Sequence, residues 1–251
     1  MKNAKNRISR AERKFIELKK FILNNPPYIY TFEVDLNKKE CCTYAKGNES
    51  NIDEIKMEIG DLIHQIRITL DNAYWDCVSP FVNEIEHRSI QFPIGRSKSA
   101  YENNLKSRLA AKVSDDFFNK MKRIKAYPDE DGNKILCLIN ELDITDKHKF
   151  PNPIIDYTTV STSQLKEQIN NFPENINIDN MIISNCHRHI CWSINNYQIT
   201  KEFISIPPTT FLYEKELNIN IGISIKDGLP LLETLDKMIN EVKNTISILS
   251  E

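Results

Sequence analysis

The feature that most constrains the fold is a long helical period from residue 52 to about residue 79. Apolar side chains recur there every three or four residues, at Ile55, Ile59, Leu62, Ile66, Leu70, Ala73 and Cys77. At 100° per residue these positions share one face of an α-helix, which must be buried against other elements. Pro80 ends the pattern because its ring cannot continue the helical hydrogen bonds. This segment is predicted to be the longest helix of the fold.

Further amphipathic helices are predicted at both ends of the chain and in its middle. The first apolar stripe ends before the NNPP sequence at 24–27 and consists of Ile8, Ala11, Phe15, Leu18 and Ile22. The last stripe consists of Leu231, Leu235, Met238, Val242 and Ile246. Three shorter helices are expected at about 97–109, 114–126 and 133–143, with Asn133, or Ser114 with Asp115, as N-caps.

Residues rich in β-branched and aromatic side chains predict strands elsewhere. A hairpin is expected over 28–35 and 40–45, and later strands near 154–160, 181–183, 200–206 and 217–225. The expected fold class is α+β, with a helical bundle-like middle packed on an antiparallel sheet and amphipathic helices at both termini. The 251 residues fit a single domain, with two lobes as an open alternative. Those lobes would be 1–150, mainly helical with an N-terminal hairpin, and 151–251, strands plus a terminal helix.

Composition excludes several classes of protein. The formal net charge of −2 argues against a generically polycationic nucleic-acid binder. With only 6 glycines, the sequence has neither GxGxxG nor GxxxxGK[ST], so the two commonest nucleotide-binding loops are not expected. No apolar stretch is long enough for a membrane span, and the basic N-terminus has no apolar region behind it. We therefore expect a cytoplasmic protein without a membrane partner.

Charge is distributed unevenly along the chain. Residues 1–20 contain 8 basic and 2 acidic side chains, and residues 96–125 contain 9 and 3. Residues 126–146 reverse this balance, with 1 basic and 6 acidic side chains. Solvated helix faces explain such runs in most proteins. If the two basic segments adjoin in space, they would form a patch that attracts phosphate.

The 6 cysteines have no CxxC spacing and follow no secretory signal, so all are expected to be reduced thiols. The sequence also contains a Cys/His cluster, and such clusters can bind zinc. Alternate residues of a strand share one face, where they can act together. In a strand His187, His189 and Cys191 would share a face, and Cys186 directly precedes them. No second ligand pair lies nearby, and no cofactor is predicted. Whether the cluster binds a metal is left open.

The long helix also carries a polar set. Asp61, His64, Arg67 and Asp71 fall within about 120° of one another, roughly opposite the apolar stripe. A solvated face with paired charges is one interpretation. However, Ile68 and Trp75 lie in the same sector, which indicates that something covers it. His64 could then transfer protons near neutral pH, Arg67 could stabilise a phosphate or an oxyanion, and Trp75 could contact a ligand.

A second polar set follows the predicted helix 133–143. It contains Asp146, Lys147, His148 and Lys149. Side chains at the end of a helix, at the edge of a lobe, commonly take part in function. His148 could transfer protons, and the two lysines could bind an anion. The alternative is a helix C-cap in which the three basic residues complement the helix dipole.

Four motifs resemble, in the same order, those of a large group of uncharacterised bacterial proteins. Residues 58–75 (EIGDLIHQIRITLDNAYW) resemble an approximate GDxLHxLRxxLDHLxW pattern, with Asn72 at the place of its second histidine. FPI at 92–94, AYP at 126–128 and the run 138–149 ending in DKHK match its later segments, and a strand and terminal helix like 217–249 close it. This resemblance implies no particular function.

The chain is more distantly similar to HEPN ribonucleases, which place an arginine, four to six residues, and then a histidine on one helix of a bundle. That superfamily cleaves RNA without metal, through attack by the 2′-hydroxyl. Here Asn72 follows Arg67 at that spacing, and an amide cannot shuttle a proton. The resemblance therefore implies that His64 or His148 does this work.

Two hypotheses follow. In the first, a bacterial protein of toxin or phage-defence type cleaves phosphodiesters of RNA or of a nucleotide. Arg67 would hold phosphate, His64 or His148 would transfer protons, and Asp71 would orient one of them. In the second, the same residues form a structural network in a non-catalytic binding or regulatory module, with a protein partner or a second copy of the chain. Both place Arg67 beside a turn at 146–148, with Asp146 as its remote acceptor.

Overall fold

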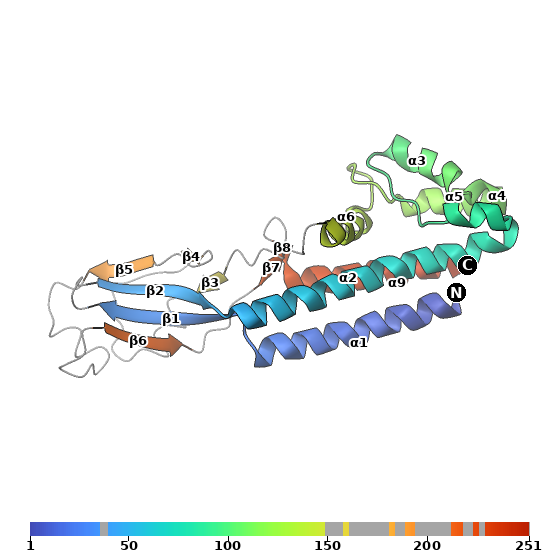
Figure 1. Cartoon of the computed structure of the whole chain (residues 1–251). Helices are drawn as coiled ribbons and strands as arrows, with labels where there is room; N and C mark the ends of the chain where they lie inside the picture. Colours follow the sequence, from blue (N-terminus) through green and yellow to red (C-terminus); the bar gives the residue numbers. More distant parts are fainter. Residues whose placement is uncertain are drawn as a thin grey trace. The chain divides into compact units, whose positions relative to one another are not determined.

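The computed structural model describes residues 1–35, 40–148, 158–160, 181–183, 189–193, 212–217, 223–225 and 229–250 (Figure 1). The chain divides into two compact units. The first, here called the helical unit, comprises Met1–Lys20, Lys56–Asn152 and Leu232–Glu251. The second unit comprises Phe21–Ile55 and Pro153–Leu231. All described residues of the candidate site belong to the helical unit.

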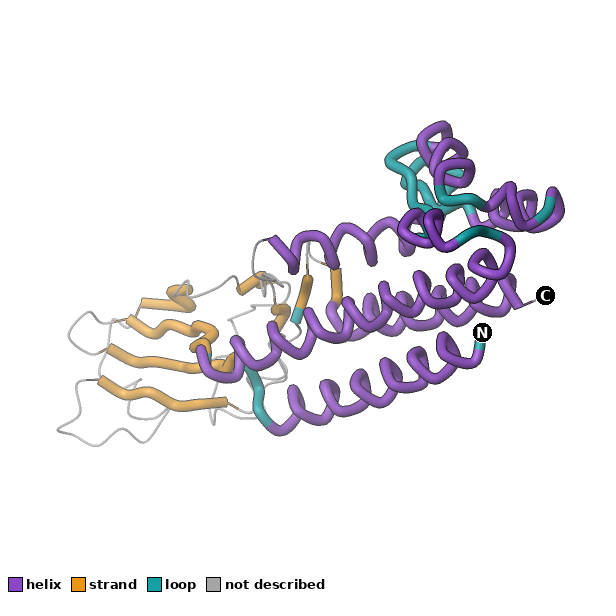
Figure 2. The backbone as a smooth tube through the Cα atoms, turned by 45° about the vertical axis from the view of Figure 1, so that its right-hand side comes forward, coloured by secondary structure: helices purple, strands orange, loops and turns teal. Residues whose placement is uncertain are grey.

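Three long helices dominate the described chain: α1 (Lys2–Asn24), α2 (Glu49–Val78) and α9 (Leu231–Ser250). Figure 2 shows them running side by side. After α2 come two short 3₁₀ turns, η1 (Ser79–Phe81) and η2 (Glu84–Ser89), and four further helices. These are α3 (Lys98–Ser107), α4 (Ala110–Val113), α5 (Asp115–Ile124) and α6 (Lys134–His148). None of the helices described is long and apolar enough to cross a membrane.

Packing confirms the predicted phases of the long helices. The stripe of α2 from Ile55 to Ala73 is at most 1% exposed at each predicted position, and Cys77 is half-buried. Four of the five predicted stripe positions of α1 and all five of α9 are also buried. Helix α2 buries more than its stripe, because Ile63, Arg67 and Tyr74 on the adjoining side are covered too.

Side-chain caps fix where the shorter helices begin. Ser114 Oγ accepts a hydrogen bond from the backbone N–H of Phe117, and Asn133 Oδ1 accepts one from Leu136, as predicted. Helix α6 continues to His148 instead of ending at residue 143. No glycine or proline interrupts the chain before Pro151, so nothing local stops the helix earlier. The segment 146–148 is therefore the last turn of a helix, and the prediction of a turn there is wrong.

All described strands belong to the second unit. β1 (Tyr28–Asp35) pairs antiparallel with β2 (Glu40–Gly47), and β5 (His189–Ser193) and β6 (Leu212–Leu217) flank them in the order β5-β2-β1-β6. Two short antiparallel pairs complete the strands: β3 (Thr158–Val160) with β4 (Met181–Ile183), and β7 (Ser224–Ile225) with β8 (Leu229–Pro230). The strand predicted at 200–206 lies outside the described residues.

The expected α+β class, with the helices packed on an antiparallel sheet, is wrong. Of the residues whose side chains the structure places, 77% are helical. The described part of the helical unit contains no strand. The physical reason is that the apolar faces of α1, α2 and α9 bury one another. An amphipathic helix whose apolar face is covered by other helices needs no sheet to bury it.

Candidate functional site

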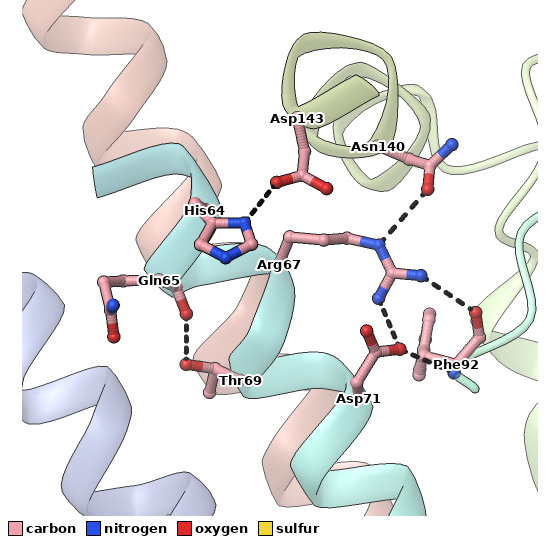
Figure 3. A network of polar contacts seen from close by, with 8 residues as sticks. All are labelled: His64, Gln65, Arg67, Thr69, Asp71, Phe92, Asn140 and Asp143. Carbon is pink, nitrogen blue, oxygen red and sulfur yellow. Dashed lines mark hydrogen bonds and ion pairs between the residues drawn. The ribbon is translucent and has the colours of Figure 1, made fainter. Parts of the chain in front are cut away.

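Arg67 is the centre of a buried polar network on α2, and its side chain is only 4% exposed. Each of its three guanidinium nitrogens donates a hydrogen bond (Figure 3). Nε donates to Asn140 Oδ1 at 3.2 Å, Nη1 to Asp71 Oδ1 at 2.7 Å, and Nη2 to the carbonyl oxygen of Phe92 at 3.4 Å. A buried guanidinium needs such acceptors, because desolvating its charge without them costs several kcal/mol.

Asp71 completes the network. Its Oδ1 also accepts a hydrogen bond from the backbone N–H of Phe92 at 2.9 Å. The pair Arg67–Asp71 therefore holds both backbone polar groups of Phe92 and fixes residues 92–94 against α2. The local pairing with Asp71 confirms the sequence prediction. Asn140 and the Phe92 carbonyl are further acceptors, so Arg67 links α2, α6 and the FPI segment.

His64 forms the second part of the site, one turn before Arg67 on the same helix. Its Nδ1 lies 2.7 Å from Asp143 Oδ1 of α6 (Figure 3). The carboxylate is 4% exposed and the imidazole 40% exposed. A buried carboxylate on one ring nitrogen favours the tautomer with its proton on Nδ1, which leaves the Nε2 lone pair free to accept another proton. This is the geometry of a side-chain base that a carboxylate orients.

Sequence reasoning missed Asn140 as a partner of Arg67, and missed Asp143 as the partner of His64. A signal for both was present. Leu136, Ile139, Asn140 and Asp143 follow the spacing of a buried helix face. Polar side chains at positions that the period assigns to the core must find partners there, so this pattern predicts a buried polar contact.

The other predicted site residues have different outcomes. Trp75 is 39% exposed, and its ring centroid lies 4.9 Å from that of His87, while Ile68 is half-buried. The cover predicted for this face is therefore complete over Arg67 and partial elsewhere. Asp146, Lys147 and His148 lie in the last turn of α6, but their side chains are outside the described residues, as is Lys149. Their roles remain predictions.

Two cysteines of the helical unit are free thiols, Cys77 and Cys137. Burial raises the pKa of both, and for Cys137 to about 11, so neither is an activated nucleophile. No group of three or more metal-ligating side chains occurs among the described residues. The side chains of Cys186, His187, His189 and Cys191 lie outside that part. Comparisons with protein-family models, with curated proteins and with solved structures find no match.

Proposed function

We propose that this protein cleaves phosphodiester bonds of RNA or of a nucleotide, with His64 as the group that transfers protons. The observation that supports this proposal is the pair of His64 with Asp143. The carboxylate is buried and the imidazole is half-exposed, so a buried group orients a ring that solvent can reach. An imidazole that a neighbouring carboxylate holds in position is a common group for such proton transfers.

The reaction would use the neighbouring hydroxyl of the substrate. His64 Nε2 accepts the proton of the 2′-hydroxyl, and the 2′-oxygen forms a bond to phosphorus while the bond from phosphorus to the 5′-oxygen breaks. The leaving oxygen takes a proton from water, and the products are a 2′,3′-cyclic phosphate and a 5′-hydroxyl. Asp143 stabilises the imidazolium that forms, because its carboxylate accepts the Nδ1 proton in a hydrogen bond.

Arg67 would support this site without touching the substrate. Its three nitrogens are engaged and its side chain is buried, so it serves as a positioning residue. Asn140 and Asp143 lie three residues apart on one face of α6. The hydrogen bond from Arg67 to Asn140 therefore fixes the helix that supplies Asp143. This role replaces the phosphate contact that the sequence suggested for Arg67.

The test is incubation of the purified protein with total RNA and with a panel of nucleotides, beside His64→Gln and His87→Gln. His87 is a matched control, because its ring packs on Trp75 and not on a buried carboxylate. We expect cleavage by the wild type and by His87→Gln, and loss of cleavage in His64→Gln with an unchanged melting temperature. Cleavage by His64→Gln at the wild-type rate would refute the assignment, and inert wild-type protein would refute the activity.

A non-catalytic binding or regulatory module is the second candidate. The hydrogen bonding of Arg67 favours it, because a buried guanidinium that bonds to protein acceptors through all three nitrogens is typical of a structural network. In that case His64→Gln changes no activity, and the network serves only to join α2, α6 and residues 92–94. The same incubation therefore separates the two candidates.

A further inference from the structure

The engagement of Arg67 leaves open which residues hold the phosphate of a substrate near His64. Helix α1 carries basic side chains that lie level with this part of α2. Lys14 Nζ lies 3.0 Å from Asp61 Oδ2, and the amino group of Met1 forms an ion pair with Asp76. These two contacts fix α1 and α2 as antiparallel neighbours and set their register. In that register Arg10, four residues before Lys14, lies level with residues 65–67 of α2, within about one helical turn of the level of His64.

Helical geometry also gives the side of α1 on which these cations lie. Arg7, Arg10 and Lys14 have the spacing i, i+3, i+7, so they share one flank of the helix. The ion pair of Lys14 with Asp61 shows that this flank borders α2. On α2, His64 follows Asp61 by three residues, which places it about 60° further around the helix. In Figure 3 the ribbon of α1 lies on one side of His64 and that of α6 on the other.

Charge on this flank is not neutralised. Lys14 is engaged by Asp61 and lies 3.5 Å from Glu58, but Arg7 and Arg10 have no carboxylate partner among the described residues. Arg10 is exposed and Arg7 is half-exposed. Of the two acidic side chains in 1–20, Glu12 forms an ion pair with Lys243 of α9. The other, Glu17, lies two turns from Arg10 and takes no part in a described ion pair.

We propose that Arg7 and Arg10 bind a phosphate group of the substrate, in single-stranded RNA or in a free nucleotide, next to His64. Two guanidinium groups offer paired N–H donors that match phosphate oxygens, and both are accessible from solvent. This proposal rests on the proposed function, because it names the group that brings the reacting phosphodiester to the base. It also gives the basic segment 1–20 a role in binding.

The experiment measures binding, so that it does not depend on cleavage. A short fluorescein-labelled 2′-O-methyl RNA cannot react through its 2′-oxygen, and its fluorescence anisotropy reports binding at several salt concentrations. The wild type is compared with Arg7→Gln/Arg10→Gln. The control is Arg96→Gln/Arg123→Gln, which removes the same charge from two exposed arginines elsewhere in the helical unit. Adenosine 5′-monophosphate is added as a competitor in a second arm.

We expect Arg7→Gln/Arg10→Gln to bind at least about tenfold more weakly, with the control within about twofold of the wild type. Loss of two contacts to single-stranded phosphates should reduce the slope of log Kobs against log salt by about 1.4. Equal losses in both double variants would show a general effect of net charge, and wild-type binding by Arg7→Gln/Arg10→Gln would exclude the site. Either outcome would overturn the proposal.

Two further arms complete the design. Displacement of the probe by adenosine 5′-monophosphate would show that a single phosphate is enough for binding, whereas lack of displacement would show that the RNA chain is needed. Either result supports the site once the arginines are shown to matter.

Arg7→Lys/Arg10→Lys should recover the salt slope, which shows that loss of charge rather than of fold weakens binding. If binding follows these expectations but no RNA is cleaved, the phosphate site stands and the proposed catalysis falls.

Discussion

His64 and Asp143 are 79 residues apart in the sequence, yet Nδ1 of one lies 2.7 Å from Oδ1 of the other. The pairing arises where α6 packs on the face of α2 that also buries Arg67. The Asp143 carboxylate is nearly inaccessible and the His64 imidazole is half-exposed, so a buried group fixes the orientation of a ring at the surface. This asymmetry distinguishes it from the surface ion pairs of the same unit, such as Lys98 with Asp131.

Asp143→Asn tests that orientation. An amide at this position can donate to Nδ1, which would move the imidazole proton to Nε2 and remove the base from the solvent side. If the proposed cleavage occurs, its kcat should fall by about 10³- to 10⁴-fold, as when a triad carboxylate is replaced by its amide. Asp116→Asn, at an exposed position of α5, is the control and should keep wild-type kcat. An unaffected rate in Asp143→Asn would show that the carboxylate does not orient the base.

Arg67→Ala tests the structural role of the network. The substitution leaves the half-buried Asp71 and Asn140 and the buried Phe92 carbonyl without their donor, which should reduce the free energy of unfolding by about 1–3 kcal/mol. Arg123→Ala, at an exposed position, should stay within about 0.5 kcal/mol of the wild type. Urea titrations give both values. A change below 1 kcal/mol in Arg67→Ala, taken as an order-of-magnitude limit, would mean that water replaces the guanidinium at little cost.

The sequence allowed the helices to be predicted more reliably than the way they pack. The apolar stripes of α1, α2 and α9 are local periodic signals, and their phases can be worked out from residue spacing alone. The partner of each stripe cannot, because an amphipathic helix packs equally well on a sheet or on other helices. Strand-forming residues later in the chain suggested a sheet, whereas the described strands all fall in the second unit.

The site divides in the same way. Arg67 and Asp71 are four residues apart on a helix, so their pairing was predictable. Asn140, Asp143 and the backbone of Phe92 reach the site only through tertiary packing. The period of α6 indicates that Asn140 and Asp143 need polar partners, but it does not say which residues these partners are. The end of α6 was predicted too early because charged residues after 143 resemble a helix C-terminus. Because the helix continues to His148, Asp143 lies within it and not at its end.

Leu62→Ala should destabilise the helical unit by about 2–5 kcal/mol, because the side chain is 1% exposed on the apolar stripe of α2 and its truncation leaves a cavity. Met57→Ala is a matched control on the same helix, since Met57 is 59% exposed, and it should change stability by less than about 0.5 kcal/mol. Thermal and urea unfolding measure both. Equal effects of the two substitutions would show that the buried face of α2 is assigned incorrectly.

Cys137 should make the free energy of unfolding fall as the pH rises above about 9. Burial, with Asp129 and Glu141 adding to it, raises the pKa of its thiol from 9.0 to about 11. Below pH 9 the thiol is protonated in both states, so it has no effect on stability. Between about pH 9 and about pH 11 the unfolded chain loses this proton while the folded protein keeps it, which favours unfolding. Cys137→Ala should therefore flatten the fall of unfolding free energy with pH, measured by urea titration from about pH 8 upwards. Parallel curves for variant and wild type would show that Cys137 is not the group responsible.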